Sequence, residues 1–117
     1  MTITTPLCDL LGIDHPIILG GMMGISDAAL TTAVSNGGGL GTLSSATSGV
    51  DGTRAELSKI AETTNRSFSV NFPLFHPMVP NLLDLLPELG VKIAVSYTHL
   101  RAHETDSYLV CRLLLEK

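Results

Sequence analysis

Two short stretches of this chain of 117 residues carry residue types that hold small ligands. GGMMG, Gly20 to Gly24, follows a β-like apolar run, and Asn71 ends a second such run. Adjacent glycines let a flat ligand approach the backbone closely. The thioether of Met22 is a soft, polarizable contact, and the Asn71 amide offers donors and an acceptor to a ring edge. The pattern indicates binding of a planar heteroaromatic ligand.

Each of these residues also has a plainer interpretation. A methionine beside glycines commonly fills a core, and an asparagine at a strand end can bond to its own backbone. Their common position favours ligand contact. Gly20 to Gly24 follow the carboxyl end of one predicted strand and Asn71 lies at the carboxyl end of another, where barrels and open parallel sheets hold their ligands.

A third glycine-rich stretch, NGGGLG at Asn36 to Gly41, is interpreted differently. A phosphate-binding fingerprint follows a strand and opens a helix, whereas this stretch closes a helix and opens a strand. It therefore predicts a helix end with close helix-to-strand packing. His15 is expected at the opposite, stabilising end of the strands, and His76 in a rigid proline-flanked loop; neither is assigned as a catalytic base.

The elements that must position these residues alternate between strand and helix. A helix is expected from an N-cap at Ser26 to Asn36, and a second one from a capping box at Thr53 to Glu56. A short leucine-rich helix is limited by Pro87. Strands are expected at Pro16 to Leu19, Gly39 to Ser45, Ser67 to Phe72, and Val91 to Val95. This order predicts an α/β fold of four parallel strands, either doubly wound or a (β/α) barrel.

Composition excludes several classes of function. The chain has 44% hydrophobic and 15% charged residues and a formal net charge of −4. An acidic balance argues against nucleic-acid binding, and no apolar run is long enough to span a bilayer, so a cytoplasmic protein is predicted. Cys8 and Cys111 lie far apart without metal-ligand spacing, which predicts two free thiols and no metal site.

Taken together, LCDLLGIDHPIILGGM, SDAALTTAVSNGGGLGTLSS, FSVNFPL and LGVKIAV resemble, in order and spacing, the N-terminal half of the FMN-dependent nitronate monooxygenases, formerly called 2-nitropropane dioxygenases. The resemblance implies the first half of a TIM (β/α)8 barrel that holds FMN and oxidises small alkyl nitronates with molecular oxygen. It implies that Gly20, Gly21 and Met22 lie along the flavin and that Asn71 hydrogen-bonds it. The family's catalytic histidine and phosphate-binding loops are expected beyond this sequence.

Two alternatives stay open. The flavin-dependent enoyl-acyl-carrier-protein reductases share nearly the same opening motifs, so an enoyl thioester is the second candidate substrate. A different class is a non-catalytic half-barrel that associates with itself.

The end of the chain is interpreted separately from residues 1–94. VSYTHLRAHET can be encoded by DNA similar to the end of a transposase-based sequencing adapter, and LVCRLLLEK by DNA similar to its flow-cell end. Residues 95–117 are therefore predicted to be a translated library artefact fused to a truncated gene. Four strands cannot close an eight-stranded barrel, so we expect an inactive fragment that self-associates through exposed strand edges.

Overall fold

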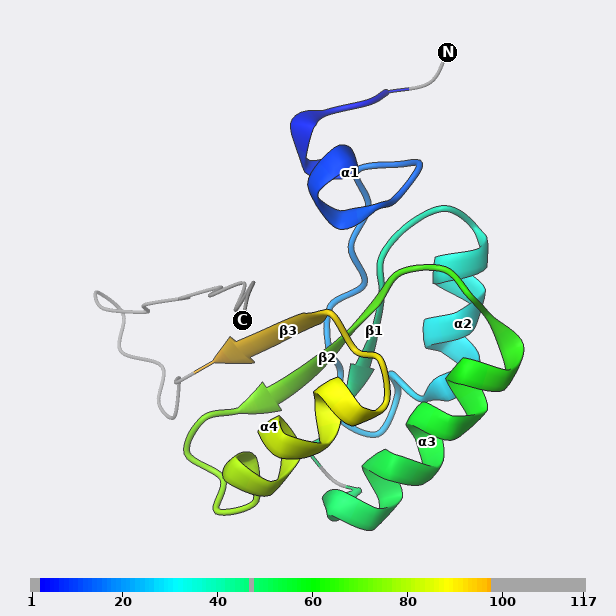
Figure 1. Cartoon of the computed structure of the whole chain (residues 1–117). Coiled ribbons are helices and arrows are strands. Elements are labelled where there is room, and N and C mark those ends of the chain that lie inside the picture. Colours follow the sequence, from blue (N-terminus) through cyan, green and yellow to red (C-terminus); the bar gives the residue numbers. More distant parts are fainter. Residues whose placement is uncertain (1–2, 47, 98–117) are drawn as a thin grey trace, which may run out of the picture.

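The chain forms a parallel sheet with helices packed on one of its faces (Figure 1). The structure is a computed structural model and describes residues 3–46 and 48–97. Three strands lie in the order β1 (Gly41–Ser44), β2 (Phe68–Pro73) and β3 (Ile93–Tyr97). Both pairings are parallel. The predicted α/β class with parallel strands is therefore confirmed.

The first predicted strand, Pro16 to Leu19, is only a single β-bridge between Ile18 and Leu40. The amide of Leu40 donates to the carbonyl of Ile17 at 2.9 Å, and the amide of Leu19 donates to the carbonyl of Leu40 at 2.9 Å. This segment therefore runs parallel to the chain just before β1, in the position of a first strand. The pairing extends no further because the glycine-rich loop begins at Gly20.

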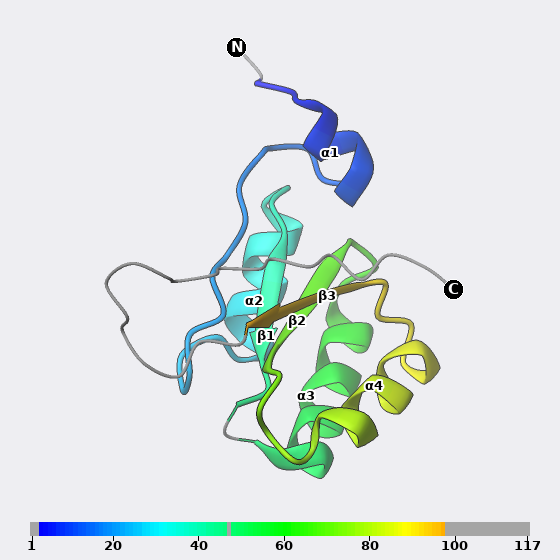
Figure 2. The same ribbon diagram turned by 90° about the vertical axis from the view of Figure 1, so that its left-hand side faces the viewer.

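Three helices, α2 (Ala28–Asn36), α3 (Gly49–Thr63) and α4 (Val79–Glu88), cover one face of the sheet (Figure 2). Strand side chains alternate between the two faces, and the apolar set meets these helices. The main core cluster includes Leu43, Val70, Phe72, Leu57, Ile60, Leu82, Leu85 and Leu86. On the other face the hydroxyls of Thr42 and Ser69, opposite each other in register, lie 2.7 Å apart.

The remaining helix, α1 (Pro6–Leu11), covers the end of the sheet where the strands begin (Figure 1). It contributes to a second apolar cluster, formed by Cys8, Leu11, Ile13, Leu40 and Ile93. Cys8 is a free, buried thiol. Cys111 lies outside the described residues. The opposite end of the sheet, where the strands finish, is left for the candidate site.

The predicted helix starts were wrong at two positions. Asp27 is the N-cap of α2, since its Oδ1 accepts from the amide of Leu30 at 2.9 Å. The helix α3 begins at Gly49, so Thr53 lies inside it and donates to the Gly49 carbonyl at 2.7 Å. Neither Ser26 nor Thr53 therefore caps the helix for which it was predicted.

The NGGGLG stretch packs as predicted, with Gly37 as the C-cap of α2. An added β carbon at Gly41 would lie 2.0 Å from the carbonyl oxygen of Thr31, so the backbones of α2 and β1 touch. The hydroxyl of Ser35 accepts from the Gly41 amide at 3.1 Å. Among the described residues, no helix is long and apolar enough to cross a membrane.

We expect Gly41→Ala to lower the free energy of unfolding by about 3 kcal/mol, because α2 must move away from β1. The change is measured as a shift of the urea midpoint. Gly20→Ala is the matched control, because an added β carbon there meets no described atom within 4 Å. Equal midpoints for the two variants would contradict the close packing of α2 on β1.

Candidate functional site: the carboxyl ends of the strands

The structure brings together two of the residues predicted to contact a ligand. An added β carbon at Gly21 would lie 2.5 Å from both Cβ and Nδ2 of Asn71, so the Gly21 backbone packs directly on that side chain. Gly20 precedes this contact with open space at its Cα, and the side chain of Met22 is 40% exposed. The segment after the first bridge and the end of β2 therefore form one corner.

The amide of Asn71 is half-buried and unpaired. Its backbone carbonyl accepts from the amide and the hydroxyl of Ser45, at 3.0 and 2.9 Å. Its side chain forms no hydrogen bond with any described residue. The bond to its own backbone, the plainer explanation for an asparagine here, is therefore not formed. A half-buried amide costs free energy when unpaired, so this one is suited to a ligand.

The glycine loop, defined here as residues 20–26, is folded onto its own last residue. Ser26, which was predicted to be an N-cap, is 2% exposed and turns its hydroxyl toward the loop. This hydroxyl donates to the Gly20 carbonyl at 3.1 Å and accepts from the Met22 amide at 2.9 Å. Sequence reasoning missed this role, although a serine five residues after the Gly20–Gly21 pair was visible.

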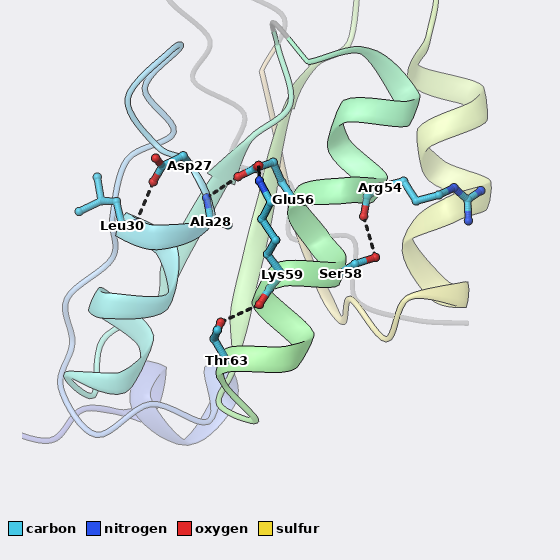
Figure 3. Close-up of polar contacts among 8 residues, drawn as sticks. All are labelled: Asp27, Ala28, Leu30, Arg54, Glu56, Ser58, Lys59 and Thr63. Atoms are coloured by element: carbon cyan, nitrogen blue, oxygen red, sulfur yellow. Dashed lines mark hydrogen bonds and ion pairs between the residues drawn. The ribbon is translucent and has the colours of Figure 1, made fainter.

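A carboxylate of α3 fixes the start of α2, which follows the glycine loop directly (Figure 3). Glu56 Oε2 accepts from the amide of Ala28 at 2.8 Å, and Oε1 pairs with Lys59 at 2.5 Å. The Lys59 hydrogen bond, and then the Ala28 amide, hold the pKa of Glu56 below its usual value. The hydrogen bond from Lys59 to Glu56, together with the negative charge of Glu56, raises the pKa of Lys59. A carboxylate is also favoured at a helix N-terminus by the helix dipole.

Neither His15 nor His76 is assigned a role in the corner formed by Gly21 and Asn71. His15 is exposed and donates its amide to the Gly38 carbonyl at 3.0 Å, at the end of the sheet near α1. His76 lies in the loop between β2 and α4, where its Nδ1 accepts from the amide of Met78 at 3.3 Å. Both therefore have local structural roles, and neither is placed as a base.

Two recesses lie elsewhere on the described part of the chain. A recess of about 510 Å³ lies behind the glycine loop, between the start of α2 and α3, and one of about 590 Å³ lies near α1. Gly20, Gly21, Met22 and Asn71 line neither of them. The candidate site is therefore a surface corner at the carboxyl ends of the parallel strands, separate from both recesses.

Parallel strands that alternate with helices define an α/β protein of the (β/α)-barrel class, of which the described residues form a part. The family model described as nitronate monooxygenase matches residues 4–102. The chain belongs to the nitronate monooxygenase family. The match extends eight residues past the boundary predicted at Ala94, and β3 continues to Tyr97, so the strand itself crosses that boundary. Most of the predicted artefact, residues 98–117, lies outside the described residues.

Three relatives illustrate the similarity. A (3aS,4S,5R,7aS)-5-hydroxy-7a-methyl-1-oxo-octahydro-1H-indene-4-carboxyl-CoA dehydrogenase of Mycobacterium tuberculosis is 36% identical over 80% of this chain and 26% of its own length. A nitronate monooxygenase of Paraburkholderia phytofirmans is 43% identical over 56% of this chain and 18% of its own. FabK from Thermotoga maritima superposes with a TM-score of 0.80 at 34% identity, covering 84% of this chain and 32% of that protein. The chain thus spans at most about a third of these relatives.

The Glu56 contacts generate a pH prediction. Because the folded-state pKa of Glu56 is depressed below 4.5, its contribution to stability is complete above about pH 4.5 and is lost as the pH falls through the folded value. We expect the urea midpoint to fall over that range, and to fall less steeply in Glu56→Gln. Glu62→Gln, an exposed position on the same helix, is the control. A wild-type slope in Glu56→Gln would contradict the assignment.

Proposed function

We propose that this chain supplies the FMN-contacting wall of an oxidoreductase that oxidises alkyl nitronates with molecular oxygen. The observation that carries the proposal is the unpaired Asn71 amide packed on Gly21. Family membership supports the reaction class, and the place of this contact, at the carboxyl ends of the strands, suits a barrel cofactor. FMN, when bound, supplies the electron acceptor.

The residues present fit a flavin in size and chemistry. Gly20 and Gly21 have no side chains to hold a flat ring away from the backbone, and Met22 is exposed beside them. Asn71 presents both donors and an acceptor to a heterocycle edge. These residues bind and orient, and no proton transfer is assigned to them. The catalytic histidine and the phosphate loops belong to the later part of the family's barrel.

A second candidate is a flavin oxidoreductase acting on a thioester. The observation that favours it is the M. tuberculosis relative, whose name gives a carboxyl-CoA compound as substrate and a dehydrogenation as reaction. The same wall of Gly21 and Asn71 suits both reactions, because it contacts the cofactor and not the substrate. The two candidates therefore differ only in residues beyond this wall.

On its own, the 117-residue chain is proposed to be inactive and to associate with itself. The edge segment before the glycine loop exposes Ile17 and Ile18 by 61% and 46%, and the loop exposes Met23 and Ile25 by 66% and 60%. A strand edge flanked by exposed apolar side chains favours pairing with another chain. Only the longer enzyme would bind a small-molecule substrate and react with oxygen.

The reaction is tested on the protein translated from the re-sequenced source locus, prepared with a different library chemistry. We expect this longer protein to consume oxygen with propyl nitronate and not to oxidise reduced nicotinamide with a crotonyl thioester. The opposite preference would support the thioester candidate. A natural stop codon directly after Lys117 would contradict both enzymes and leave the self-associating half-barrel.

In that longer protein, Asn71→Leu is expected to weaken FMN binding by roughly tenfold to a hundredfold, because one buried hydrogen bond is worth about 1–3 kcal/mol. Quenching of FMN fluorescence measures the dissociation constant. Asn65→Leu, an exposed asparagine before β2, is the matched control. Unchanged affinity in Asn71→Leu would remove this residue from the cofactor site.

For the 117-residue chain itself, we expect no stoichiometric flavin after purification and a mass above the monomer in light scattering. Ile18→Lys should shift it toward the monomer, because a charge at a strand edge opposes pairing. Stoichiometric yellow flavin, or a monomeric wild type, would contradict this expectation.

A further inference from the structure

We infer that Ser26 is the positioning residue of the glycine loop, and that its hydroxyl determines which peptide groups of the loop face the cofactor. This inference rests on the proposed function, because it concerns the same corner of Gly21 and Asn71.

The hydroxyl of Ser26 closes the loop from inside. It donates to the carbonyl of Gly20 and accepts from the amide of Met22, at 3.1 and 2.9 Å, so one side chain engages the residues on both sides of Gly21. The amides of Ser26 and Ile25 both donate to the Met22 carbonyl, at 2.9 and 3.1 Å. The loop is therefore a compact turn organised around a hydroxyl that is 2% exposed.

Ser26 also fixes this turn to the sheet. Its carbonyl accepts from the amide of Ser44 at 2.9 Å, and Ser44 is the β1 residue opposite Asn71 in the parallel register. The glycine loop and Asn71 are thus both fixed next to Ser44 of β1. This common attachment explains how Gly21 packs on Asn71 although 50 positions separate them in the sequence.

The pairing by Ser26 selects what remains available to a ligand. It occupies the Gly20 carbonyl and the Met22 amide, whereas the N–H and C=O of Gly21 form no hydrogen bond with any described residue. The Asn71 amide beside them is unpaired as well. The corner therefore offers both donors and acceptors from Gly21 and Asn71, as the edge of a planar heterocycle requires.

A serine is suited to this task because one hydroxyl donates and accepts at the same time. Alanine would leave the Gly20 carbonyl and the Met22 amide without their partner in a partly buried turn. Cysteine keeps the volume but is a weaker donor and acceptor.

The loop is tested in the 117-residue chain by amide hydrogen exchange, followed by NMR. In Ser26→Ala we expect the Met22 amide to exchange at least about tenfold faster relative to the Val70 amide in the core, with a smaller increase in Ser26→Cys. Ser58→Ala, an exposed serine of α3, should leave the ratio unchanged. If Ser26→Ala unfolds and both amides accelerate, Ser26→Cys decides. An unchanged ratio in Ser26→Cys would then overturn the inference.

The cofactor role is tested in the longer protein, where Ser26→Ala should weaken FMN binding about tenfold at a temperature well below the melting temperature of the flavin-free variant. A loosened loop with wild-type FMN affinity would overturn the positioning role. A wild-type protein that binds no FMN would overturn the proposed function alone, since the exchange result does not depend on flavin.

Discussion

The parallel register of β1, β2 and β3 is the constraint on which the rest of the structure depends. It sets Ser44 opposite Asn71 and Asn71 opposite Val95, so the strands finish at one common edge. Parallel neighbours need a crossover between them, and the helices that make these crossovers cover one face of the sheet (Figure 2). One end of the sheet is covered by α1, and the candidate site lies at the other end.

The glycine loop adds a second constraint, because a flexible segment must be held before it can hold a ligand. Glycine makes close approach possible but brings conformational freedom. Ser26 removes part of that freedom from inside the loop, and Glu56 fixes the helix that follows it (Figure 3). The two anchors come from different elements, so the loop is positioned relative to both the sheet and α3.

Much of the fold was predictable because its signals are local. The alternation of strands and helices follows from apolar spacing, and the tight packing at Gly41 follows from a glycine run between a helix and a strand. The end-of-strand position of Asn71 was visible for the same reason. The first strand was predicted at the right place but is only one bridge long, since the turn at Gly20 ends the pairing.

The helix caps were the part that local patterns could not supply. Ser26 and Glu56 both have the residue types of caps, and both act as caps or clamps, but for segments other than those the spacing suggested. Glu56 caps α2 across 28 positions, and Ser26 bonds back into the loop. A capping-box motif describes only hydrogen bonds within one helix start. It does not show whether another element of the fold offers the same side chain a better hydrogen-bond partner.

The groups of Gly21 and Asn71 that have no hydrogen-bond partner among the described residues are half-buried and lie side by side. Folding usually pairs buried polar groups, because an unpaired one costs free energy. Here the neighbouring Ser26 and Ser45 pair with Gly20, Met22 and the Asn71 backbone, yet leave these groups open. On the proposed function, this gap in an otherwise paired corner is where the cofactor completes the hydrogen bonds. The proposal requires a flat cofactor with both donors and acceptors at its edge, because the groups left open lie on a glycine backbone and a planar amide.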